Sequence, residues 1–252
     1  VGIINFAYWL AKNGATYQDP DLELVDTWAE AWSYSLIKAS NELAKEKGAC
    51  TLNMETKYGH GITPNQTYKA DVNELVKHKE RMDWKGLRAS LKEHGIRNST
   101  LMALMPAETS AQISNSTNGI EAPRSYISIK QSKHGVLKQV VPGFPYYKNK
   151  YDLLWDQKSP TGYLKIMAVL QKYIDQGISV NTSYNPEHFE DEKVPMSVLL
   201  TDIITFYKYG GKQLYYNNTY DGQGEIDINK DDASDQLELS EIDEEDCESC
   251  KI

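Results

Sequence analysis

An alternation of helix and strand patterns near the end of the chain constrains the fold most strongly. A helical pattern over residues 163–176 is followed by a strand pattern over 178–184. A second helical pattern over 195–209 is followed by a strand pattern over 212–217. Two strands joined by a helix form a βαβ unit, so the sequence predicts an α/β barrel or sheet.

Earlier segments predict four further elements. Asp83 can cap a short helix that ends at Gly95, residues 99–105 form a strand candidate, and residues 123–141 have the alternation of a β-hairpin. Residues 21–47 predict a long amphipathic helix. The expected core stripe of this long helix consists of Leu22, Val25, Trp28, Trp32, Leu36, Ala39 and Leu43.

Charge is distributed unevenly along the chain. Residues 221–252 contain 13 acidic residues and two lysines, whereas the preceding 220 residues carry 25 basic and 23 acidic side chains. The acidic stretch lacks aromatic residues and regular periodicity, which is typical of a flexible arm. We therefore expect a folded domain over residues 1–220 and a disordered acidic tail over 221–252.

The composition argues against two classes of partner. The chain offers no clustered Lys and Arg face with interleaved aromatics, as a nucleic-acid site would require. No apolar run approaches the ~18–20 residues of a membrane span, and no cleavable leader begins the chain. We expect a cytoplasmic protein that binds neither nucleic acid nor membrane. Because the chain begins almost within a helical pattern and without an initiator Met, we also expect a fragment or a split product.

Residues 104–112 run from a strand pattern into a helical pattern. Thr109 and Gln112 have the spacing of a capping box, so a helix N-terminus is expected at the end of a strand. Free backbone N–H groups, the helix dipole and the hydroxyls of Thr109 and Ser110 favour a phosphate or carboxylate site. A helix cap without a ligand is the commoner meaning of this pattern alone, and Glu108 disfavours an anion unless its side chain points away.

Tyr215 and Tyr216 are adjacent in the last strand pattern. Two close phenols can pass an electron and a proton between them, but neighbouring strand residues normally face opposite sides of a sheet. A shared path therefore requires a bent backbone or stacked rings. Core or interface packing is the commoner role of an aromatic pair in a strand.

Cys247 and Cys250 form a Cys-x-x-Cys pair at the end of the acidic stretch. This spacing permits reversible disulfide formation. Zinc would need two further ligands, and no nearby His or Cys supplies them, so no metal site is expected. A redox shuttle is favoured over an incidental thiol pair, whereas Cys50 is interpreted as a core thiol.

Several runs, taken in order, resemble the large, catalytic subunit of class I ribonucleotide reductases of the bacterial and phage type. The resemblance covers nearly all of residues 1–221. It is carried by residues 38–45 (KASNELAK), 97–101 (RNSTL), 104–110 (LMPAETS), 117–121 (TNGIE), 214–219 (LYYNNT) and the terminal CKI. One such run would be weak evidence, but their order together is highly specific.

The resemblance implies a fold, a reaction and partners. The chain would be the C-terminal part of the family's ten-stranded α/β barrel, followed by a disordered acidic redox tail. The reaction would be the reduction of ribonucleoside diphosphates to deoxyribonucleotides by radical chemistry. An N-terminal portion of the large subunit, a small subunit with a di-metal radical cofactor, and thioredoxin or glutaredoxin would be the partners. The chain itself would bind no cofactor.

The resemblance also assigns roles to residues. Tyr215 and Tyr216 match the family's radical-relay pair, and Cys247 and Cys250 match the tail thiols that reduce the active-site disulfide. The family's substrate diphosphate site is matched by Pro106, Ala107, Glu108, Thr109 and Ser110. A hydroxyl residue is common where Ala107 stands, so backbone N–H groups would contribute more here.

The family's radical-bearing cysteine, its reducing cysteine pair and its proton-handling Glu and Asn match no residue of this chain, Cys50 included. The N-terminal portion of the subunit is therefore required for catalysis. Two alternatives stay open. One is a non-catalytic module that binds partners and exchanges disulfides, and the other is a free-standing binder of nucleotide phosphates.

Overall fold

The computed structural model describes residues 1–132 and 135–222, and residues 1–221 form one compact unit of mixed helices and strands. The α-helices are α1 (Phe6–Asn13), α2 (Leu22–Lys47), α3 (Trp84–His94), α4 (Glu108–Ile113), α5 (Phe144–Tyr147), α6 (Thr161–Gln171) and α7 (Met196–Lys208). The strands are β1 (Ile127–Ser132), β2 (Gly135–Val140), β3 (Val180–Tyr184) and β4 (Leu214–Thr219). Short 3₁₀ helices span Asn53–Glu55, Tyr58–His60, Pro64–Gln66, Ala70–Glu74, Lys148–Lys150, Pro186–His188 and Glu190–Glu192. The predicted acidic tail lies outside the described residues from residue 223 onward, and with it Cys247 and Cys250.

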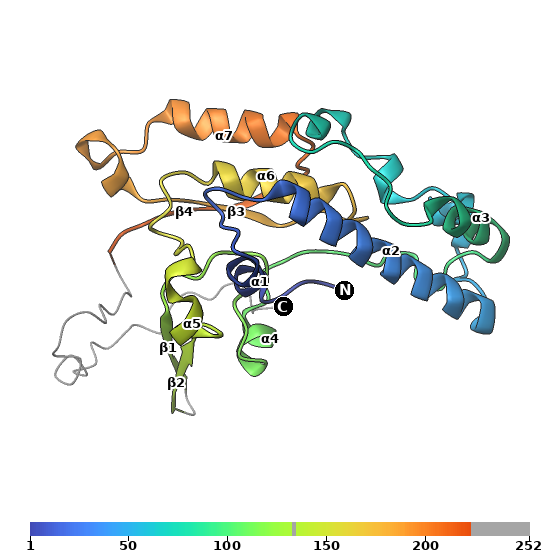
Figure 1. Ribbon diagram of the computed structural model, residues 1–252, viewed down its shortest axis with the longest axis horizontal. Helices are drawn as coiled ribbons and strands as arrows, with labels where there is room; N and C mark the ends of the chain where they lie inside the picture. Colours follow the sequence, from blue (N-terminus) through green and yellow to red (C-terminus); the bar gives the residue numbers. More distant parts are fainter. Residues whose placement is uncertain (133–134, 223–252) are drawn as a thin grey trace. The chain divides into compact units, whose positions relative to one another are not determined.

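The predicted βαβ unit is confirmed. Strands β3 and β4 pair in parallel and run side by side, and α7 connects them (Figure 1). A parallel bridge also joins Leu104 to Ile178, just before β3. The predicted hairpin is confirmed as well, because β1 and β2 pair antiparallel with Ile127 opposite Val140.

Helix α6 forms the centre of the hydrophobic core. Its sequence, TGYLKIMAVLQ, is apolar on nearly every side, and a helix of this kind is normally buried all round. Ile166, Met167, Val169 and Leu170 are fully buried, and α6 contacts both α2 and α7. A Cβ on Gly162 would lie 1.9 Å from the carbonyl oxygen of Tyr17, so this close approach requires glycine.

Capping residues determine where α2 and α3 begin, and the sequence predicts the one at Asp83. Asp21 accepts a hydrogen bond of 2.9 Å from the backbone N–H of Leu24. Asp83 accepts one of the same length from the N–H of Gly86. Both helices end at a glycine with positive φ, namely Gly48 and Gly95.

The predicted core stripe of α2 is confirmed only in part. Val25 is fully buried, and Leu22, Trp28, Trp32 and Leu36 are partly buried and pack against the core, but Ala39 is exposed and Leu43 is 40% exposed. The fully buried face consists of Val25, Asp26, Ala29, Glu30, Ser33, Ile37, Ser40, Asn41 and Ala44. A face that contains two carboxylates does not register in an apolar periodicity, so the periodicity points to the neighbouring tryptophans instead.

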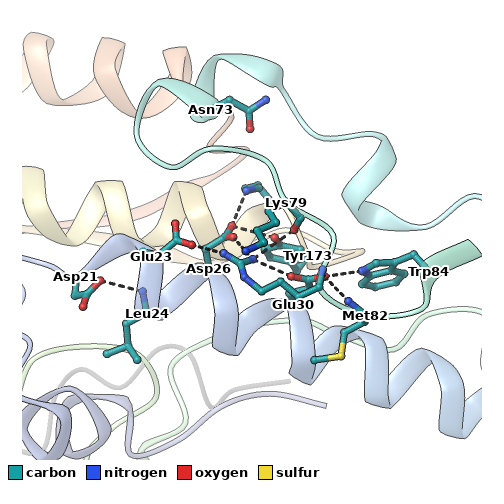
Figure 2. A network of polar contacts seen from close by, with 12 residues as sticks. Asp21, Glu23, Leu24, Asp26, Glu30, Asn73, Lys79, Met82, Trp84 and Tyr173 are labelled. Carbon is teal, nitrogen blue, oxygen red and sulfur yellow. Dashed lines mark hydrogen bonds and ion pairs between the residues drawn. The ribbon is translucent and has the colours of Figure 1, made fainter.

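Asp26 and Glu30 are buried because basic residues neutralise them (Figure 2). Arg81 donates to Asp26 at 2.8 Å and to Glu30 at 2.9 Å. The ammonium group of the fully buried Lys172 lies 2.5 Å from Asp26. Further donors reach the two carboxylates from the Tyr173 hydroxyl, the Trp84 indole and the backbone N–H groups of Arg81 and Met82. Buried charges are tolerated when they are paired in this way, so the cluster fastens α2 to the turn that follows α6.

Two predicted elements differ from those observed. Residues 99–105 form no continuous strand, since the N–H groups of Leu101 and Met102 donate to the carboxylate of Asp175 at 2.8 and 2.9 Å. Helix α6 ends at Gln171 rather than at residue 176. The Gln171 side chain donates to the carbonyl oxygens of Ile174 and Gln176, which stabilises the turn that replaces the last part of the helix.

Candidate functional site

The predicted phosphate loop does lead into a helix, but the expected capping box is wrong. Helix α4 begins at Glu108, with Ala107 as its N-cap and no side-chain hydrogen bond at the cap. Thr109 therefore lies within the first turn, where its hydroxyl is past the capping position. The first helical hydrogen bond runs from the N–H of Ala111 to the carbonyl of Ala107 at 2.9 Å.

The loop is held by the segment 117–121 instead of by a cap of its own. The N–H of Ala107 donates to Oδ1 of Asn118 at 2.8 Å. Gly119 has a positive φ of 52°, and a Cβ there would lie 3.2 Å from the carbonyl oxygen of Met105. The backbones of the two segments therefore lie against each other, with Glu108, Thr109 and Ser110 left exposed at the helix start.

The two predicted relay tyrosines are brought together by an irregularity in β4. Val180 pairs with Leu214 but Thr182 pairs with Asn217, so Tyr215 and Tyr216 together face the single residue Asn181. An extra residue of this kind is a β-bulge, which bends the strand and redirects side chains. The ring centroids of Tyr215 and Tyr216 are 4.2 Å apart, although the two residues are neighbours in a strand. The adjacent rings are therefore in contact, which a regular strand would prevent, but their planes are tilted by 51° and do not stack.

The tyrosine pair is accessible and its hydroxyls are close. Tyr215 is 49% exposed and Tyr216 is 51% exposed. Their hydroxyl oxygens lie 3.4 Å apart, which is longer than the ~2.8 Å of an ordinary hydroxyl hydrogen bond. A small side-chain movement would therefore bring the hydroxyls within proton-transfer distance.

A set of amide and carboxylate side chains lies between the loop and the bulge. Asn118 donates to Oε2 of Glu121 at 3.3 Å, and Asn181 donates to Oε1 of Glu121 at 2.6 Å. Burial raises the pKa of Glu121, while the hydrogen bond from Asn181 and the positive charge of Arg124 oppose the increase.

The structure also contains a cavity of about 760 Å³ that includes none of the predicted site residues. It is lined mainly by residues 55–72, the end of α6 with the turn after it, and residues 207–212. Within residues 1–132 and 135–222, no group of three or more His, Cys, Asp or Glu gathers as a candidate metal site. Cys50 is partly buried and packs against the core.

Comparisons with known proteins identify the family. The sequence matches the ribonucleotide reductase barrel domain over residues 1–147 and 144–217. The chain belongs to this family. It is 53% identical to ribonucleoside-diphosphate reductase 1 subunit alpha of Salmonella typhimurium and 51% identical to that of Escherichia coli, each over 100% of this chain and 32% of the relative. It is 41% identical to ribonucleoside-diphosphate reductase subunit alpha of Enterobacteria phage T4, again over 100% of this chain and 32% of the relative.

These matches confirm the resemblance to bacterial and phage large subunits of ribonucleotide reductase. They also show that the chain spans about a third of the length of the curated relatives that it matches. Across the helices that the structure describes, none combines the length and the apolar character needed to cross a membrane.

Sequence reasoning missed two groups of residues. Glu121 and Asn118 lie in the run 117–121, which contributed to the resemblance without being given a role, and Asn181 was an unremarked polar residue in a strand pattern. The Asp26 and Glu30 carboxylates were also missed. Their separation by four residues on one side of a long helix was the available signal.

Proposed function

We propose that this chain supplies part of the large subunit of a ribonucleoside-diphosphate reductase. The overall reaction converts a ribonucleoside diphosphate and a dithiol into a 2′-deoxyribonucleoside diphosphate, a disulfide and water. The chain acts with an N-terminal large-subunit portion that carries the catalytic cysteines and with a small subunit, in the cytoplasm of a bacterial or phage-infected cell. Residues 1–220 contribute to a ten-stranded α/β barrel, and residues 221–252 form a separate redox tail.

The close contact of Tyr215 and Tyr216 carries this proposal. A phenoxyl radical on one ring takes a hydrogen atom, as an electron and a proton, from the neighbouring phenol, and the first phenol is restored. The bulge in β4 supports this transfer, because it places the ring centroids of Tyr215 and Tyr216 4.2 Å apart. The small subunit's metal centre supplies the oxidising radical when it is bound. Tyr216 and Tyr215 then relay the radical toward the cysteine of the N-terminal portion.

The substrate diphosphate is held at the start of α4. The loop Pro106, Ala107, Glu108, Thr109 and Ser110 brings backbone N–H groups and two hydroxyls to an exposed helix start. Since Ala107 uses its own N–H on Asn118, the N–H groups and hydroxyls of Thr109 and Ser110 are the donors proposed for the phosphate oxygens.

Replacing Thr109 by valine or Ser110 by alanine is expected to raise the KM for CDP about tenfold with little change in kcat. A hydrogen bond to a charged group contributes roughly 1.5–3 kcal/mol, and about 1.4 kcal/mol corresponds to a factor of ten. Ser35→Ala is the control, because the Ser35 hydroxyl bonds only locally to the carbonyl of Ala31 at 2.7 Å. Steady-state kinetics of the assembled reductase measure both constants, and an unchanged KM would contradict the assigned role of the loop.

Cys247 and Cys250 return electrons to the active-site disulfide. In each cycle the tail dithiol becomes a disulfide while the active-site disulfide becomes a dithiol, and thioredoxin or glutaredoxin then reduces the tail. Cys250→Ser is expected to abolish turnover driven by thioredoxin while a small dithiol such as dithiothreitol still supports it, because the small reductant can reach the active site directly. Cys50→Ala is the control and should keep both activities.

The proposed function is tested by CDP reduction with a dithiol. The chain is assayed alone and then mixed with an N-terminal large-subunit portion and a small subunit. Activity only in the full mixture supports a catalytic subunit completed by several parts. Inactivity in every mixture, with a stable complex seen by size-exclusion chromatography, favours the non-catalytic partner-binding and disulfide-exchange module.

A further inference from the structure

A side chain of β3 contacts the backbone of the bulge in β4. Two residues of β4, Tyr215 and Tyr216, face the single residue Asn181 of β3. The Asn181 Oδ1 accepts a hydrogen bond from the Tyr216 N–H at 3.0 Å. A side chain of β3 therefore stabilises the backbone shape that brings the two tyrosine rings into contact.

The other end of the Asn181 amide is held by Glu121. The 2.6 Å hydrogen bond from Asn181 Nδ2 to Glu121 Oε1 fixes the orientation of the amide, so that its oxygen faces Tyr216. The second oxygen of Glu121 accepts from Asn118 Nδ2 at 3.3 Å, which in the same way turns the Asn118 oxygen toward the Ala107 N–H. A carboxylate accepts at both oxygens, whereas an amide in its place could accept at only one.

The segment that carries Asn118 and Glu121 is itself firmly held. The Tyr17 hydroxyl donates to the carbonyl of Ile120 at 2.8 Å. Asn5 exchanges two hydrogen bonds with Thr117, one of 2.9 Å through its N–H and one of 3.1 Å through its side-chain oxygen. These bonds hold the segment against the N-terminal helix region, so the backbones of Asn118 and Glu121 keep fixed positions relative to each other.

We infer that Glu121 is a positioning residue that couples the loop before α4 to the tyrosine-bearing bulge of β4. The connection runs from Ala107 through Asn118, Glu121 and Asn181 to the backbone of Tyr216. Its meaning for catalysis rests on the proposed function: occupation of the loop by a substrate diphosphate would then be sensed at the relay tyrosines. The coupling itself is a property of the fold and can be measured without turnover.

Amide hydrogen exchange of the full chain, resolved by residue, tests the coupling. Asn181→Leu removes the contacts at the bulge, and we expect the N–H of Ala107, two side chains away, to exchange at least about fivefold faster. Asn118→Leu is expected to accelerate exchange at the N–H of Tyr216 by a similar factor, because coupling between sites is reciprocal. The conservative Glu121→Gln should accelerate both. Acceleration confined to the direct partner of each replaced residue would overturn the inference.

The matched control is Asn65→Leu. Asn65, which is buried, is also an asparagine in a side-chain network, accepting from the Thr63 hydroxyl at 2.7 Å and donating to Glu80 at 3.1 Å. Because it belongs to a different network, exchange at Ala107 and Tyr216 should stay at the wild-type rate. An equal acceleration in this control would assign the effect to general destabilisation and overturn the inference.

The assembled reductase provides the second readout. The Asn181 side chain contacts the bulge, yet we expect the Asn181→Leu variant to raise the KM for CDP about fivefold in addition to lowering kcat. A lower kcat with an unchanged KM would show that the bulge does not act on substrate binding. If the wild-type assembly fails to reduce CDP while the exchange results hold, the proposed function fails and the structural coupling stands.

Discussion

Replacing Tyr216 by phenylalanine is expected to reduce CDP turnover by the assembled reductase to the background of the assay. The substitution keeps the ring, and with it the centroid distance of 4.2 Å to the Tyr215 ring, but removes the O–H bond that must be broken and formed in the transfer. The side chain is half exposed, so the loss of its hydroxyl should leave folding intact. Tyr215→Phe is expected to give the same result, because the loss of either phenol hydroxyl interrupts the path. Product formation and CDP binding are measured in parallel.

Tyr207→Phe is the matched control for these variants. Tyr207 lies on α7 and is 71% exposed. The ammonium group of Lys69 lies over its ring, 4.3 Å from the centroid, and the substitution retains this ring. We expect wild-type turnover from this variant. Turnover that survives Tyr216→Phe would remove the tyrosine pair from the reaction and with it the main support for the proposed function.

Replacing Lys172 by methionine is expected to lower the free energy of unfolding by about 3–5 kcal/mol, because it removes one member of a buried, paired charge cluster. Asp26 then keeps Arg81 and the Tyr173 hydroxyl but loses the ammonium group at 2.5 Å, in a position without access to water. Burial, and after it the charge of Asp26, raises the pKa of Tyr173, so this phenol stays protonated and cannot replace the lost positive charge. Urea denaturation of the full chain measures the change.

Lys45→Met provides the comparison for this prediction. Lys45 pairs with Glu42 at 2.9 Å on the exposed side of α2, where water solvates both charges. The urea midpoint of the Lys45→Met variant should match that of the wild type. A Lys172→Met midpoint equally close to the wild type would show that the buried cluster does not hold α2 to the segment after α6.

Much of the fold follows from local sequence rules. Asp21, Asp83, Gly48 and Gly95 mark helix ends through hydrogen bonds or backbone conformations that a single residue type provides. The βαβ unit follows from the hydrophobic periodicity and the lengths of the successive helix and strand patterns. The burial of Asp26 and Glu30 on α2 does not follow from local rules, because it depends on Arg81 and Lys172, which are distant in the sequence.

The sequence predicts the residue types of the candidate site but not its geometry. Residues 104–110 and the adjacent tyrosines are recognisable as runs, and the start of a helix near Glu108 follows from composition. The position of the cap does not, since the N–H of Ala107 is satisfied by Asn118 from a later segment. The bulge in β4 depends on the register with β3 and on the Asn181 side chain, and neither is encoded within the strand that bends.

The central claim is that this chain completes a ribonucleoside-diphosphate reductase, and a titration tests it most directly. Increasing amounts of the chain are added to fixed amounts of the N-terminal large-subunit portion and an excess of small subunit, and the rate of dCDP formation is recorded. We predict no dCDP without the chain, a rate that rises with each addition, and a plateau at one chain per N-terminal portion. A rate that does not depend on the chain, or no dCDP at any ratio, would contradict the account.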